Sequence, residues 1–193
     1  MGNIALPTPH WPVLFWFCLW LSPATVQAQD INQRIADIGA GSYIVYQAGS
    51  HSFVQVYRGA SGPFWVVDVV DGTDPNGSRL SREFRDARGQ LVRVDYASGL
   101  SLRFNPHNCQ RSVGACLFIQ TGPDGDSQHG RLTTATADGY TYESSVFDRP
   151  GGNPVLAETG RIVLDAFGSN AAGQITAQDG TVTQVRLVQA VYR

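Results

Sequence analysis

REFRDARGQLVRVDYASGLSLRF, residues 82–104, carries the clearest pattern in this chain of 193 residues. Apolar side chains lie at alternate positions, and charged or polar side chains fill most of the gaps. A period of two is typical of strands that bury one face. Ala87-Arg88-Gly89 and Ala97-Ser98-Gly99 fit three-residue hairpin loops, because glycine takes the left-handed conformation of the last position at least cost. The stretch predicts three antiparallel strands joined by two hairpins.

These loop lengths predict the register of the three strands. The expected apolar pairs are Phe84 with Val92, Val92 with Phe104, Val94 with Leu102, and Tyr96 with Leu100. On the other face, Glu83 is expected opposite Arg93, and Arg93 opposite Arg103. We expect the Val94 face to be core and the Arg93 face to be solvated, with a small anion site at the two arginines as the alternative.

Similar loops recur at Ala137-Asp138-Gly139 and Gln178-Asp179-Gly180, between further runs of alternating residues. The sequence therefore predicts a single all-β domain over residues 29–193, with about ten or eleven short strands. An antiparallel meander of this kind can form a barrel, a half-barrel or a sandwich. Residues 30–39 predict a short N-terminal helix, since Asp30 can cap it and Gly39 can end it.

The N-terminal residues predict a secretory signal peptide over residues 1–28. A short apolar run at residues 13–21 precedes Val26-Gln27-Ala28, which suits cleavage after Ala28. A membrane anchor is the alternative, but the run is much shorter than the roughly 20 residues that span a bilayer. We therefore expect a periplasmic or secreted protein with no transmembrane segment after cleavage.

Two cysteines, Cys109 and Cys116, remain in residues 29–193. An even number of cysteines in an exported chain predicts a disulfide, and the spacing is not that of a CxxC metal or redox pair. The formal net charge is −2, so the composition shows no electrostatic signature of a nucleic-acid partner.

No spacing in the sequence marks a catalytic or metal-binding residue, and no cofactor is expected. His51, His107 and His129 stand in polar, loop-like surroundings, which favours solvated turn residues. No GxSxG motif marks a nucleophile. Two acidic segments, residues 68–78 and 122–130, could bind calcium, but neither fits an EF-hand loop, and Asp and Asn are common turn formers.

Trp65 is the only tryptophan in residues 29–193. A buried core position is the commoner outcome for tryptophan, and a ligand contact is the alternative that makes Trp65 a candidate binding residue. The sequence favours an exported, non-catalytic β-domain that binds an apolar small molecule or another envelope protein. A hydrolase with a site assembled from distant residues and a structural module without a small ligand are the alternatives. A groove lined by Trp65 and tyrosines favours binding, and a histidine beside Asp or Ser favours the enzyme.

Overall fold

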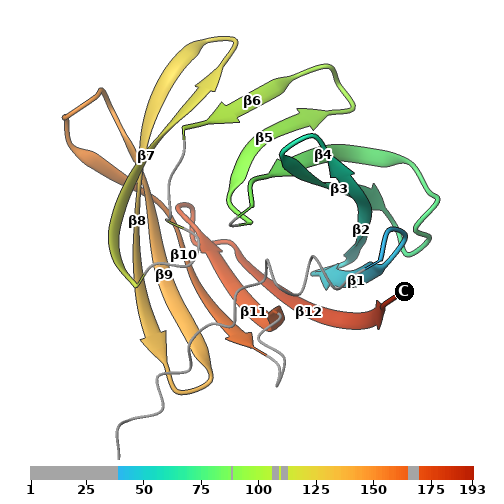
Figure 1. Cartoon of the computed structure of the whole chain (residues 1–193). Helices are drawn as coiled ribbons and strands as arrows, with labels where there is room; N and C mark the ends of the chain where they lie inside the picture. Colours follow the sequence, from blue (N-terminus) through green and yellow to red (C-terminus); the bar gives the residue numbers. More distant parts are fainter. Residues whose placement is uncertain (1–38, 88, 106–108, 110–112, 165–169) are drawn as a thin grey trace, which may run out of the picture.

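The computed structural model describes residues 39–87, 89–105, 109, 113–164 and 170–193, which form a closed β-barrel (Figure 1). Each of its twelve strands is antiparallel to the next, and β12 pairs with β1 to close the sheet. The strands are β1 Tyr43–Ala48, β2 His51–Ser61, β3 Phe64–Asp71, β4 Arg79–Arg85, β5 Leu91–Tyr96, β6 Ser101–Phe104, β7 Gly114–Gly122, β8 Gly125–Thr136, β9 Gly139–Phe147, β10 Pro154–Leu164, β11 Asn170–Ala177 and β12 Val182–Val191.

This architecture confirms the all-β prediction and selects the closed barrel from the three predicted arrangements. The strand number is twelve, slightly above the expected ten or eleven. Residues 1–28 and most of the predicted helix lie outside the described residues. No helix in the described part of the chain has the length and apolarity to cross a membrane.

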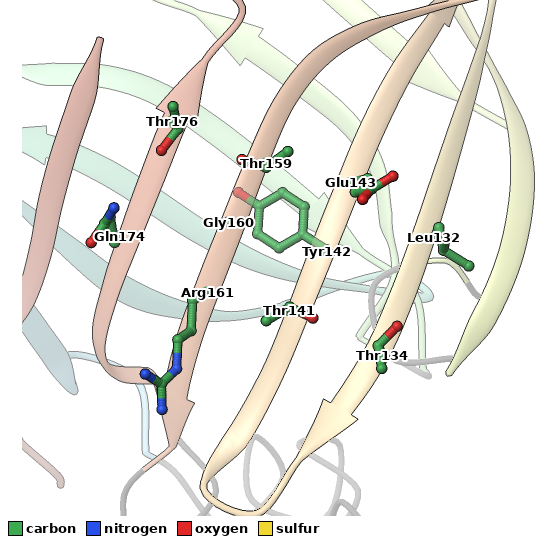
Figure 2. Close-up of a pocket in the computed structure, with 10 residues that line it drawn as sticks. All are labelled: Leu132, Thr134, Thr141, Tyr142, Glu143, Thr159, Gly160, Arg161, Gln174 and Thr176. Atoms are coloured by element: carbon green, nitrogen blue, oxygen red, sulfur yellow. The ribbon is translucent and has the colours of Figure 1, made fainter. Parts of the chain in front are cut away.

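The register of the strands assigns each side chain to one of two faces, because partners in an antiparallel pair lie on the same side of the sheet. One face carries Gln47, Val54, Arg161 and Arg186. We call it the outer face, because Figure 2 looks at it over β8–β11 with other strands of the barrel behind this wall. The opposite, inner face carries Tyr142, among others.

The outer face of β1–β3 holds the most deeply buried apolar cluster. Val45, Val54, Val56 and Val70 form this valine cluster, and none is more than 2% exposed. The β3–β4 connection approaches it, since a Cβ atom on Gly77 would come within 3.2 Å of Val70 Cγ1. Part of the core is therefore packed against the outside of the barrel wall.

The wall formed by β8–β12 buries the other face. Thr133, Tyr142 and Ile162 point inward and are at most 8% exposed, whereas the outward Gln174 and Arg186 are exposed. In β12 the burial alternates residue by residue over most of the strand. This wall has the single buried face that its alternating sequence predicts.

The central hairpins confirm part of the predicted register. Val94 pairs with Leu102 and Arg93 with Arg103, and Val94 is 5% exposed. The hairpin at Gly99 is also as predicted, since Tyr96 N–H donates to the Leu100 carbonyl and Gly99 has a φ of 91°.

The predicted pairing of β4 with β5 is wrong. A register shift between Phe84 and Arg85 places Phe84 opposite Arg93 and Glu83 opposite Val94. The loop length does not reveal this bulge, which adds one residue on one strand and so exchanges the two faces beyond it. As a result, the Arg93 guanidinium lies over the Phe84 ring, 3.7 Å from its centroid, on the outer face.

β6 and β7 share the shortest hydrogen-bonded ladder in the barrel, and we call it the short seam. Only two residue pairs join these strands, Arg103 with Thr121 and Phe104 with Gln120. The strands on either side share longer ladders, including the β7–β8 pair, which runs from Gly114 to Gly122. The barrel is closed here by few hydrogen bonds.

Candidate functional site

Aromatic side chains gather on the inner face of the barrel. The register places most of the aromatic residues of the strands on this side: Tyr46, Phe53, Tyr57, Trp65, Tyr96, Phe104, Phe118, Tyr140 and Tyr142. Several pack in pairs, such as Tyr46 with Phe53 at 5.4 Å between ring centroids, and Phe104 with Phe118 at 6.2 Å. Most of these rings are half-buried, so they keep surface for further contacts.

Trp65, the candidate binding residue, lies in β3 on this inner face. Its ring is 5.8 Å from that of Tyr57, in a tilted contact, and the residue is half-buried. Val67 and Val69 follow it on the same face, also half-buried. Trp65 is therefore not part of the fully buried valine cluster, which lies on the other side of the same strand.

A row of polar residues on β8 interrupts the aromatic surface. Ser127, His129, Arg131 and Thr133 alternate along the strand and all face inward. Ser127 Oγ lies 2.9 Å from His129 Nε2, and the His129 ring stacks on Phe118 with 5.1 Å between centroids. Burial lowers the pKa of His129, so the imidazole is neutral at pH 7.

The position of His129 corrects the prediction that it is a solvated turn residue. A hydroxyl beside a neutral imidazole is the arrangement that activates serine nucleophiles. Among the described residues, however, no carboxylate is hydrogen-bonded to this ring. The pair thus lacks the third, orienting group of a complete triad.

Arg131 and Thr133 lie beside Tyr142 in this row. The Arg131 guanidinium carbon is 3.9 Å from the centroid of the Tyr142 ring, which itself covers Gly160. Burial raises the pKa of the Tyr142 hydroxyl well above its usual range, and the charge and hydrogen bonding of Glu158 raise it further. Tyr142 is therefore a neutral phenol throughout the physiological range.

A shallow pocket of 330 Å³ opens on the outer face of β8–β11 (Figure 2). Figure 2 shows its lining, which is mostly polar: Leu132, Thr134, Thr141, Tyr142, Glu143, Thr159, Gly160, Arg161, Gln174 and Thr176. Arg161 is held by Asp138, with 2.8 Å between Nη2 and Oδ2. None of the residues that the sequence suggested for a site lies in this pocket.

The acidic segments suggested as calcium loops have other structural roles. Asp68 lies within β3 and pairs with Arg58 at 2.9 Å and with Arg82 at 2.7 Å. Asp74 accepts a hydrogen bond from the backbone of Asn76, as turn-forming aspartates do. Asp126 accepts one from the Thr121 hydroxyl. Within the described residues, no group of three metal-ligating side chains is close enough to hold a metal ion.

The predicted disulfide is present between Cys109 and Cys116, whose Cα atoms are 5.3 Å apart. It ties the β6–β7 connection to β7, next to the short seam. Disulfides form and persist in oxidising compartments, which supports a location outside the cytoplasm.

Sequence reasoning missed the β8 row for a physical reason. Gln128 and Thr134 on the outer side of β8 are as polar as Ser127 and Thr133 on the inner side, so no hydrophobic alternation marks the strand. The signal that could have found it is the alternate spacing of Ser127, His129 and Arg131.

Comparisons with known proteins give a distant structural similarity and no sequence match. No family model and no curated protein sequence matches the chain. A crystal structure from Bacteroides fragilis, of a protein described as exported and as having a YmcC-like fold, is similar with a TM-score of 0.38 and 8% sequence identity. The match covers 80% of this chain and 97% of that one. A similarity this distant supports no inference about activity or ligand.

Proposed function

We propose that this protein is an exported, non-catalytic binding protein that holds an apolar molecule against the inner face of its barrel. The observation that carries the proposal is the concentration of half-buried aromatic rings on that face, with Trp65 and Tyr57 among them. Barrels of this general size either fill with side chains or keep room for one small ligand. Aromatic and aliphatic side chains with a few polar groups are the usual lining of such sites.

Export is supported by two features. The apolar run and the Val26-Gln27-Ala28 segment match a signal peptide, and the Cys109–Cys116 disulfide suits an oxidising compartment. An envelope protein is the other partner that the sequence suggested. The inner aromatic face favours a small apolar molecule over a protein, because a closed sheet presents its inward rings to something that fits inside it.

The test uses Trp65 as a reporter in the exported protein. Titration with dodecanol or a phospholipid should change its fluorescence, because a ligand on the inner face contacts the indole ring or excludes water from it. The matched control is the double variant Trp65→Phe with Phe64→Trp, which moves the tryptophan to the outer face of the same strand. The tryptophan fluorescence of this variant should not change during the titration.

Two results together would reject the binding function: unchanged Trp65 fluorescence in the wild-type protein, and native mass spectra that show only the bare polypeptide. A closed structural barrel would then be the better description.

Ester hydrolysis is a second candidate function, favoured only by the 2.9 Å contact of Ser127 with His129. Ser127 Oγ would attack the ester carbonyl while His129 accepts its proton and passes it to the departing alcohol, and water would then release the acid from the acyl-serine. The exported protein should cleave p-nitrophenyl butyrate, and Ser127→Ala should abolish the activity. Ser101→Ala, on the outer face of β6, is the control. A rate of hydrolysis no faster than in buffer, or one unchanged in Ser127→Ala, would exclude the hydrolase function.

A further inference from the structure

We propose that Arg131 and Thr133 form an anion-binding subsite on the inner face, which receives the carboxylate or phosphate head group of an amphipathic ligand. The inference rests on the proposed function and names the chemical class of its ligand.

The position of the two side chains suits an anion-binding subsite. They are two residues apart on β8 and point inward beside Tyr142, in the middle of the aromatic surface. The Arg131 guanidinium lies over the Tyr142 ring at 3.9 Å, which orients it in a fixed plane. A guanidinium held in this way presents several N–H donors in the fork geometry that matches carboxylate and phosphate oxygens.

Both residues also have polar atoms without a hydrogen-bond partner among the described residues. Among the described residues, Arg131 Nε and Thr133 Oγ1 are buried and have no hydrogen-bond partner. Thr133 is only 4% exposed. Buried polar groups are nearly always paired in native proteins, because leaving one unpaired costs free energy. An N–H donor and a hydroxyl that are both unpaired on one face point to a ligand that accepts hydrogen bonds.

The charges around the subsite favour an anionic ligand as well. No carboxylate in the described residues lies within ion-pair distance of Arg131. Glu158 is the acidic group on the neighbouring inner surface, opposite Ser144, which also pairs with Arg131. Glu158 interacts with the Tyr142 hydroxyl, and no ion pair between Glu158 and Arg131 is present in the described part of the chain. His129, the other titratable group of the row, is neutral at pH 7.

Arg93 provides the internal comparison. Its guanidinium also lies over an aromatic ring, Phe84, at 3.7 Å, but on the outer face. Arg93 forms an ion pair with Asp95 at 3.2 Å, so its charge is already compensated. Within the described residues, the two arginines thus share the stacking and a buried Nε without a hydrogen-bond partner, and they differ in face and in charge partner.

The experiment compares ligands that share a twelve-carbon chain and differ in head group. Dodecanoate, dodecyl phosphate and dodecanol are titrated into the exported protein, and binding is measured by calorimetry and by Trp65 fluorescence. Inorganic phosphate is titrated as a fourth probe, to separate a lipid head group from free phosphate. We expect the two anionic amphiphiles to bind about tenfold to a hundredfold more tightly than dodecanol, as hydrogen bonds to a charged group allow. Inorganic phosphate should bind far more weakly than dodecyl phosphate.

Variants then locate the head group. Arg131→Met keeps the unbranched stem and should remove the tighter binding of the anionic amphiphiles. Dodecanoate should then bind about as weakly as dodecanol. Thr133→Val, of similar shape, should weaken dodecanoate binding about threefold to tenfold. Arg131→Lys should restore part of the affinity, and Arg93→Met should leave all four titrations unchanged. Circular dichroism confirms that each variant is folded. If Arg131→Met does not fold, Thr133→Val and the loss of dodecanoate affinity at high salt decide the question.

The outcomes separate the two proposals. If none of the amphiphiles binds, the proposed function is wrong. If dodecanol binds and dodecanoate binds no more tightly, or if Arg131→Met weakens both equally, binding to the inner face stands and the anion subsite is rejected. If inorganic phosphate binds as tightly as dodecyl phosphate, the site takes free phosphate and the amphipathic ligand is rejected.

Discussion

The walls formed by β1–β3 and by β8–β12 belong to one closed sheet, yet they bury opposite faces. In the first wall the valine cluster packs on the outer face, below the β3–β4 connection. In the second, Tyr142 and Ile162 are buried on the inner face, and the outer face meets solvent. The buried face of a strand is therefore set by what covers it locally, and closure of the barrel alone does not decide it.

The sequences of the two walls differ accordingly. In β3 the run FWVVDVVD is apolar at almost every position, as strands covered on both faces are. In β12 the residues from Thr183 to Leu187 alternate between inward apolar or small side chains and outward polar ones. A continuous apolar strand thus marks the wall with a second layer, and an alternating strand marks the wall without one.

The largest effect should come from placing the same charge on the outer face of each wall. Val54→Asp, in the valine cluster, should cost at least about 4 kcal/mol and abolish cooperative folding, because a buried carboxylate there has no partner. Val182→Asp, also on the outer face but 51% exposed, should change the free energy of unfolding by about 0.5 kcal/mol or less. Denaturant unfolding measures both. Similar costs at the two positions would mean that the walls do not differ.

The next effect concerns Asp68, the buried acid of the first wall. Burial alone would raise its pKa, but hydrogen bonds and charge from Arg82 and then Arg58 outweigh burial and lower the pKa. Asp68→Asn should therefore destabilise the protein by about 2–4 kcal/mol at pH 7, since it leaves two arginines without their partner.

The same pKa shift predicts a dependence on pH. Because the pKa of Asp68 is lower in the folded protein, its stabilising contribution is complete above about pH 4, the pKa of an unfolded aspartate, and is lost as the pH falls through the lower folded pKa. The difference in unfolding free energy between the wild type and Asp68→Asn should shrink below pH 4. A constant difference down to pH 2 would contradict the ion-pair explanation.

A smaller effect is expected on the inner side of the second wall, at Gly160. A Cβ atom there would overlap the Tyr142 ring, so Gly160→Ala should cost about 1–3 kcal/mol through displacement of the ring. In a Tyr142→Ala background the same substitution should cost almost nothing, and a double-mutant cycle measures this coupling. Additive effects of the two changes would show that the ring does not lie over Gly160 in solution.

The smallest effect is expected on the outer side of the second wall. Arg161 and Asp138 form an ion pair whose side chains are 59% and 46% exposed. Arg161→Gln should change the free energy of unfolding by about 0.5 kcal/mol or less, since water and salt screen exposed pairs. A cost as large as that of Asp68→Asn would indicate that the outer surface of β10 is covered in solution.

Much of the fold could be predicted from local pattern, and the limits of that prediction have identifiable causes. The alternating pattern and the hairpin loop that ends at Gly99 were enough to place Val94 opposite Leu102, because this pairing depends only on residues that are close in sequence. The bulge at Phe84 could not be seen, since one extra residue leaves the alternation of each strand intact while changing its partner. Barrel closure by β1 with β12 depends on contacts distant in sequence, which no local pattern encodes.

The candidate site was less predictable than the fold. Trp65 was identified by its rarity, and its inward orientation became visible only once the register of β3 was known. The Arg131 and Thr133 pair lies in a strand that is polar on both sides, so their burial depends on the neighbouring Tyr142 ring. Burial of a polar side chain is a property of its surroundings, and the sequence shows only the side chain.

The short seam between β6 and β7 has a mechanical consequence. A sheet under thermal stress parts first where the fewest hydrogen bonds must break together, and β6 and β7 share only two ladder pairs. Beside them, Asn105 N–H donates to the Ile119 carbonyl, and Ile119 N–H donates to Asn105 Oδ1. Amide hydrogens of Arg103 and Asn105, which point toward β7, should exchange with solvent faster than those in the middle of β9. Opening at this line would turn a cylinder into a sheet with two free edges, whose unpaired N–H and C=O groups can accept a strand from another chain. The Cys109–Cys116 bridge stands beside that line, where it limits how far the two edges can separate.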